Sequence, residues 1–130
     1  MKGTLLILIF TISSIFAIGQ ARFGYSVNEI KSEFSDKKYN LSGDYGEDGI
    51  YHLIIQLPNA NIIYLFDADK ICNTTIVGPF DQNALNYYVE YYNKNYVVIS
   101  PTEWRMYAKQ GFFNAKLVFP AEGEPFFVWE

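Results

Sequence analysis

The chain has 130 residues, with 10 Lys or Arg against 14 Asp or Glu and a formal net charge of −4 at pH 7. An acidic chain without a clustered basic face is not expected to bind nucleic acid or an anionic membrane surface. The length suits one domain with one apolar core, and a single cysteine, Cys72, excludes an internal disulfide. The fold must therefore be held together by its core.

The first segment, MKGTLLILIFTISSIFAIGQA, has one basic residue followed by an apolar run. This pattern predicts a secretory signal peptide at residues 1–19, and the small residues Ala17 and Gly19 place the cut before Gln20. A membrane anchor is the alternative, but a spanning helix needs about 20 mostly apolar residues, and this run is shorter and is interrupted by hydroxyl side chains. We therefore expect one domain at 20–130, periplasmic or secreted, with no membrane insertion after signal removal.

The first predicted element of that domain is a short helix. Ser26 and Glu29, in the stretch YSVNEIKSEFS, have the spacing of a capping box, in which the two side chains satisfy free amides at a helix start. Apolar residues then recur at helical spacing. The pattern predicts a helix over about residues 27–35, followed by a short strand at 39–41.

The stretch GDYGEDGIYHLIIQL at 43–57 begins like a calcium loop, because acidic residues precede a glycine. An EF-hand counted from Asp44 would need a ligand at Gly46 and a bidentate glutamate at the twelfth position, which is Ile55. Both ligands are missing, and the later acidic stretch DADK is incomplete in the same way. We therefore predict two polar turns, DYGEDG at 44–49 and DADK at 67–70, and no metal.

Three strands are predicted around these turns. The residues from 50 to 77 form three apolar segments rich in β-branched and aromatic side chains, separated by PNAN and DADK. Side chains in the first segment alternate, with Leu53 and Ile55 on one face and His52 and Ile54 on the other. The pattern predicts a three-stranded antiparallel meander.

The second half of the chain starts again with a helix. Asp81 is placed to cap it, and Leu85, Tyr88, Val89 and Tyr92 form an apolar stripe at positions i, i+3, i+4 and i+7. Four strands are then predicted, at 96–100, 103–108, 112–119 and 126–129.

Both halves follow the same plan of a helix, a short strand and three further strands. The stretches NIIYLFDADKIC and NAKLVFPAEGEPF align Asn61 with Asn114 and Phe66 with Phe119. This similarity predicts a structural pseudo-repeat. The fold class that follows is α+β, an antiparallel sheet of about eight strands with two helices.

The run FGYSVNEIKSEF, followed by DGIYHL and then IIYLFDADKIC, resembles small secreted proteins of Gram-negative bacteria with no assigned function. This resemblance covers residues 20–78. In plan, though not in motif, the chain is also similar to the β-lactamase-inhibitor-like modules, which join a helix and antiparallel strands in tandem and act by binding proteins. The second resemblance implies a protein ligand, and no functional residue is carried over from either group.

The sequence offers little for catalysis. His52 is the only histidine, most acidic residues fall in predicted turns, and the chain lacks a P-loop, a GxGxxG motif and a CxxC motif. We expect no cofactor, no metal and no enzymatic activity. A weak hydrolase or carbohydrate-acting enzyme that uses acidic residues is the alternative class, and an envelope structural protein is a third.

The unusual feature is the aromatic content, 11 Tyr, 11 Phe and 2 Trp, since such side chains are enriched at interfaces. On the second helix, Tyr87 and Tyr91 lie beside the apolar stripe. On the strand EWRMY, Trp104 points one way, and Arg105 and Tyr107 point the other. We predict a non-enzymatic module that binds another envelope or secreted protein through these five residues, while core or edge filling is the alternative role for them.

Overall fold

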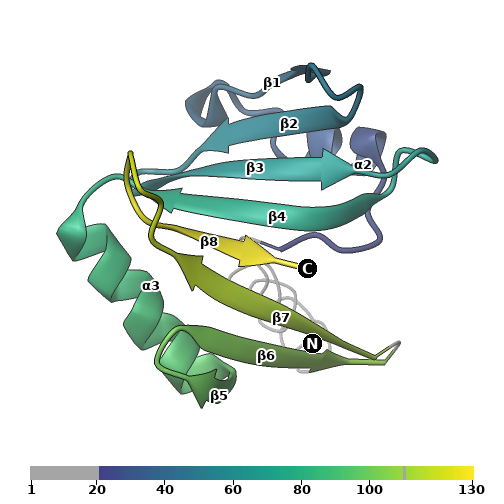
Figure 1. The fold of residues 1–130 in the computed structure, drawn as a ribbon. Helices are drawn as coiled ribbons and strands as arrows, with labels where there is room; N and C mark the ends of the chain where they lie inside the picture. The colour runs from purple at the N-terminus through teal and green to yellow at the C-terminus, as the bar shows by residue number, and fades with distance from the viewer. Residues whose placement is uncertain (1–20, 110) are drawn as a thin grey trace, which may run out of the picture.

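In the computed structural model, the described residues, 21–109 and 111–130, form one eight-stranded antiparallel sheet with two α-helices and a short 3-10 helix (Figure 1). The predicted signal peptide lies outside these residues. The elements in chain order are α2 (Val27–Glu33), η1 (Lys37–Tyr39), β1 (Ser42–Tyr45), β2 (Tyr51–Gln56), β3 (Ala60–Phe66), β4 (Cys72–Pro79), α3 (Gln82–Asn95), β5 (Val97–Ser100), β6 (Glu103–Ala108), β7 (Gly111–Val118) and β8 (Phe126–Trp129).

The strands are ordered β1-β2-β3-β4-β8-β7-β6-β5, and neighbouring strands are antiparallel throughout. Each half is therefore a helix followed by a four-stranded meander, and the halves join where β4 pairs with β8. Figure 1 shows the strands as one continuous layer, with α2 beside one half and α3 beside the other. This arrangement confirms the predicted α+β fold and its repeated plan.

The helix α2 starts where the capping box predicts. The Ser26 hydroxyl accepts a hydrogen bond from the Glu29 amide at 3.2 Å, and the Glu29 carboxylate accepts one from the Ser26 amide at 3.0 Å. The helix buries Ile30 completely, and the Phe34 ring after its last turn lies 6.2 Å from the Tyr64 ring on β3. These contacts attach α2 to the first half of the sheet.

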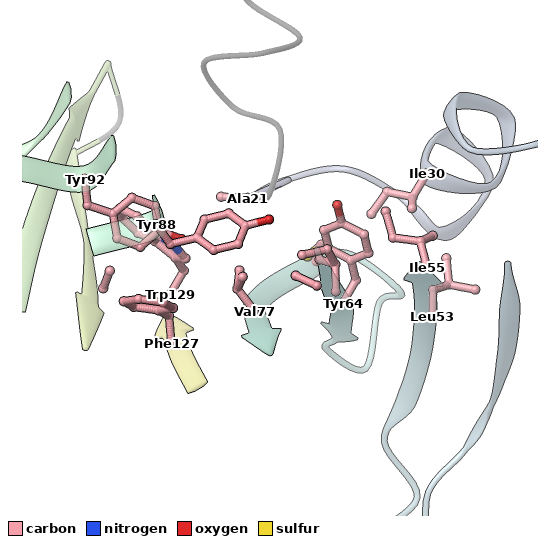
Figure 2. Packing of buried hydrophobic residues seen from close by; sticks show 14 of the residues in the cluster. Ala21, Ile30, Leu53, Ile55, Tyr64, Val77, Tyr88, Tyr92, Phe127 and Trp129 are labelled. Atoms are coloured by element: carbon pink, nitrogen blue, oxygen red, sulfur yellow. The ribbon is translucent and has the colours of Figure 1, made fainter. Parts of the chain in front are cut away.

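The helix α3 is attached to the second half through aromatic side chains (Figure 2). Its cap is Asp81, whose carboxylate accepts a hydrogen bond from a backbone amide three residues on, at 2.8 Å. Tyr88 and Tyr92 are buried, as the apolar stripe predicts. The Tyr92 ring meets Phe127 and Trp129 edge-on, with centroids 4.9 and 5.3 Å away.

A buried ion pair that was not predicted from the sequence connects the first described residues to α2. Residues 21–25 dock against β4, where the Gly24 amide donates to the Cys72 carbonyl at 2.9 Å. The Arg22 side chain is buried and donates to both carboxylate oxygens of Glu33, with its Nε 2.8 Å from Oε1. Burial acts to lower the pKa of Arg22, but its partners, Glu33 first among them, outweigh burial and leave that pKa raised.

The stretch before β2 differs from the prediction. Residues 39–41 were expected to form a strand, but η1 occupies 37–39 and β1 begins only at Ser42. The reason is local: the Asp36 carboxylate accepts a hydrogen bond from an amide two residues on, and Asn40 adopts a left-handed conformation with φ 47°. The predicted polar turn also starts later than expected, because β1 extends to Tyr45.

The two acidic stretches form the hairpin turns expected from their incomplete ligand sets. Asp48 Oδ1 accepts from the Ile50 amide at 3.0 Å, and Gly49 has φ 81°, a left-handed value that favours glycine. Asp67 Oδ1 accepts from two amides in its own turn, at 2.9 and 3.0 Å. Across the described part of the chain, no three His, Cys, Asp or Glu side chains are grouped as metal ligands would be.

Candidate binding surface

The face of the sheet opposite the helices is the candidate surface, and the strand register defines it. Aligned residues on neighbouring antiparallel strands point to the same face. One such line of residues, here called the central row, crosses all eight strands and consists of Ser42, Ile54, Ile63, Ile76, Val128, Lys116, Glu103 and Ser100. The alternate residues, among them Tyr64 and Trp129, point to the helix side. We call the side with the central row the open face.

The middle of the open face is apolar although neither described helix packs on it. Four central-row residues on adjacent strands are aliphatic and half-buried: Ile54, Ile63, Ile76 and Val128. An antiparallel sheet with one solvated face commonly carries polar side chains there. A contiguous exposed apolar patch rimmed by polar residues marks an interaction site. On the open face the four aliphatic residues are half-buried rather than fully exposed, and the polar Ser42 and Lys116 flank them in the central row.

A cationic aromatic cluster lies at one end of the open face, near the β6–β7 hairpin. The Arg105 guanidinium carbon is 4.2 Å from the centroid of the Phe112 ring, and the Tyr107 ring lies 6.1 Å from the same ring. Arg105 Nε also donates to Asn114 Oδ1 at 2.9 Å, which fixes the orientation of the guanidinium. Because Tyr107 is 64% exposed, this cluster offers a stacking surface with a positive charge.

A groove lies at the opposite end of the open face, where β4 ends and β8 begins. Its volume is about 520 Å³. The aliphatic Ile63 and Ile76 of the central row contribute to its lining, together with Phe126, Asn61 and the acidic Glu124. The open face thus has an apolar centre, an arginine at one end and a carboxylate at the other.

The five residues predicted from the sequence do not share one surface. Arg105 and Tyr107 lie on the open face. Trp104 is 0% exposed and lies on the helix side, where its indole Nε1 donates to Asn93 at 2.8 Å. The placement of Trp104 in a binding surface was therefore wrong, because α3 covers the strand face to which its side chain points.

Tyr87 and Tyr91 lie on α3, on the other side of the sheet. Their rings are stacked with centroids 6.3 Å apart, and Tyr87 is 53% exposed. Tyr91 is half-buried. Its burial and, to a smaller extent, the nearby Tyr87 raise the pKa of its hydroxyl group. The pair flanks the buried stripe as the sequence predicts, and it forms a second aromatic surface.

Alanine substitutions distinguish the role of Tyr87 and Tyr91 from that of the buried Tyr88 beside them. We expect Tyr87→Ala with Tyr91→Ala to lower the free energy of unfolding by less than about 2 kcal/mol, since partly exposed side chains lose only part of the transfer free energy. Tyr88→Ala should cost about 2 to 5 kcal/mol, because a buried ring is removed. Urea unfolding measures both. A strong destabilisation by the double variant would show that Tyr87 and Tyr91 are core residues.

The residues considered for catalysis come from several different strands and turns. His52 lies on the open face, opposite Leu65 and Asp44 in the neighbouring strands. Cys72 is buried, and burial raises the pKa of its thiol, which disfavours the reactive thiolate form. Asp48 and Asp67, one in each hairpin turn, accept hydrogen bonds from backbone amides in their own turns. Asp48 and Asp67 both line a pocket of about 400 Å³, together with Lys70, whereas neither His52 nor Cys72 lines it.

Comparison with known proteins gives no family: the chain matches no family model, no curated protein and no solved structure. Within 21–109 and 111–130, no helix has the length and apolar character needed to cross a membrane. What the protein binds must therefore be inferred from the geometry of the open face.

The apolar centre of the open face was not singled out from the sequence, although a signal for it is present. The runs HLIIQL, NIIYLF and TTIV place apolar side chains on both faces of their strands. Such runs are typical of strands buried on both faces. In this fold the described helices cover one face only, so the second apolar side is left on the surface.

Proposed function

We propose that this protein is a non-enzymatic binding module that recognises another protein through the open face of its sheet. The observation that carries the proposal is the run of four aliphatic side chains on adjacent strands, Ile54, Ile63, Ile76 and Val128, with no described helix packed over them. Flat β-surfaces with an apolar centre and a polar rim have the anatomy of protein interfaces.

The size of the apolar centre constrains how the partner binds. With strands about 4.8 Å apart, four adjacent residues form a strip about 14 Å long. A stable complex commonly buries about 800 Å² on each partner, more than such a strip provides. The contact must therefore extend to the ends of the open face, where Arg105, Tyr107 and Phe112 lie on one side and the groove on the other. This makes Arg105 and Tyr107 part of the proposed interface.

The proposed setting is the periplasm or the extracellular space, because the first 19 residues have the pattern of a signal peptide. The partner would then be an envelope or secreted protein. Intact-mass measurement of exported material should find a chain that begins at Gln20. A chain that keeps Met1 and stays in the membrane fraction would contradict this location.

Affinity capture with matched variants tests the proposed function. Replacing Ile63 and Ile76 with threonine keeps the β-branched shape and removes the apolar contact. The control replaces Val98 and Ile99 of the edge strand β5 in the same way, which also removes two exposed apolar side chains but away from the central strands. We expect the wild type and the control to retain the same envelope partner and the Ile63/Ile76 variant to lose it while remaining folded.

Two outcomes would contradict the proposal. Equal capture by the wild type and the Ile63/Ile76 variant would show that the centre of the open face is not part of an interface. Loss of capture by a variant that replaces Tyr87 and Tyr91 with alanine, with the open-face variant unaffected, would move the interface to α3.

A further inference from the structure

We propose that the groove at the Phe126 end of the open face binds a lysine or arginine side chain of the partner protein. This inference rests on the proposed function and specifies the chemistry that the partner presents at this end. The groove has a volume of about 520 Å³ and includes Ile63 and Ile76, so that it continues the apolar centre of the open face. Its other lining residues determine what it accepts.

The first of these is an unsatisfied hydrogen-bond acceptor. The Oδ1 atom of Asn61 is buried and has no hydrogen-bond partner in the described part of the chain. A buried acceptor without a donor is costly, so a ligand that brings an N–H group relieves the cost on binding. Because Asn61 lines the groove and the terminal torsion of asparagine is soft, its amide can reorient when a ligand binds. The groove therefore favours a ligand that donates hydrogen bonds.

The charge and the aromatic walls favour a cation among such donors. Glu124 lines the groove, whereas no lysine or arginine among the described residues does. Phe80, which is 48% exposed, and Phe126 present aromatic rings, and the faces of such rings attract a cation. The methylene stem of a lysine or arginine packs well on aliphatic side chains while its head reaches polar groups. An acidic side chain would be repelled by Glu124, and an aliphatic one would leave Asn61 unpaired.

The floor of the groove depends on a residue without a side chain. Gly78 pairs with Asn61 across β3 and β4 and lines the groove. A Cβ atom at Gly78 would meet only the Asn61 carbonyl oxygen at 3.7 Å, which is an ordinary contact, and Gly78 does not have a positive φ. A larger residue at this position is therefore compatible with the strand and would fill the groove.

An NMR titration with a side-chain probe tests the inference. The probe is Nα-acetyl-L-arginine methylamide, and its control is the citrulline analogue, which has nearly the same shape and N–H donors but no charge. We expect the arginine probe to shift the backbone amides of Gly78 and Phe126 saturably. Glu124→Gln should weaken its binding about two- to fivefold, as expected for an exposed ion pair. Glu122→Gln makes the same charge change in the same loop, outside the groove lining, and should leave binding unchanged.

A second variant tests the shape of the groove. Gly78→Val should abolish saturable binding of the arginine probe while the thermal midpoint stays near that of the wild type. The inference is overturned if the citrulline analogue binds as well as the arginine probe, if Glu122→Gln weakens binding as much as Glu124→Gln, or if no saturable shift occurs. If the arginine probe does not bind but the Ile63/Ile76 variant still loses capture of the partner, this inference is wrong and the proposed function remains supported.

Discussion

Replacing Glu33 with alanine is expected to lower the free energy of unfolding by about 3 kcal/mol or more, because it leaves a buried arginine without its counter-ion. The Arg22 side chain is buried and Arg22 cannot lose its proton at neutral pH. Of the hydrogen bonds shown for it, only the bond from Nη1 to the Ala21 carbonyl, at 2.9 Å, would remain. Urea unfolding at neutral pH measures the loss.

Two further variants make this test specific. Glu90→Ala removes an exposed glutamate from α3 and should change the free energy of unfolding by less than about 0.5 kcal/mol. A double variant with leucine at both Arg22 and Glu33 should recover much of the loss, because an apolar pair often replaces a buried ion pair without cost. A cost for Glu33→Ala no greater than that for Glu90→Ala would show that Arg22 does not depend on this ion pair.

We expect the free energy of unfolding to fall steeply as the pH rises above about 10, because buried tyrosines keep their protons only in the folded state. Burial raises the pKa of Tyr64, Tyr92 and Tyr96 above the ordinary value of 10.0. Below about pH 10 both the folded and the unfolded states keep these protons. Above it the unfolded state loses them while the folded state retains them, so the free energy of unfolding falls by about 1.4 kcal/mol per pH unit for each tyrosine. For three tyrosines the slope is about 4 kcal/mol per pH unit.

Urea unfolding between about pH 9 and about pH 11 checks this slope, with Tyr64→Phe as the matched variant. The Tyr64 hydroxyl is buried and has no partner in the described part of the chain, so its removal should leave stability at neutral pH unchanged or raised. The variant should also lose about a third of the alkaline slope. Stability that stays constant through this range would contradict the burial of all three hydroxyl groups.

Local signals in the sequence predict the elements of this fold well. The capping residues Ser26 and Asp81 begin the two helices as expected, and the strands of the second half lie within a residue of their predicted bounds. These signals depend on neighbours in the chain, so they can be recognised without the fold. The short strand predicted at 39–41 failed because the turn at Asn40 competes with it locally.

The candidate surface was harder to predict because it depends on how distant elements pack. Trp104 is buried because α3 lies over β6, a contact that nothing in the local sequence reveals. Arg22 follows the predicted signal peptide closely, where an exposed terminus is the ordinary expectation, yet it is buried against Glu33. Ile63 and Ile76 are in strands that are apolar on both faces, and the sequence does not show which face the helices cover.

The most direct test of the open face as the proposed binding surface is site-specific photo-crosslinking in the cells that produce the protein. A photoreactive residue is placed at Ile63, in the centre of the open face, and in a separate variant at Tyr87, on the opposite side of the sheet. We predict a discrete crosslinked partner from position 63 and none from position 87. A partner crosslinked from position 87 but not from position 63 would contradict the proposed binding surface.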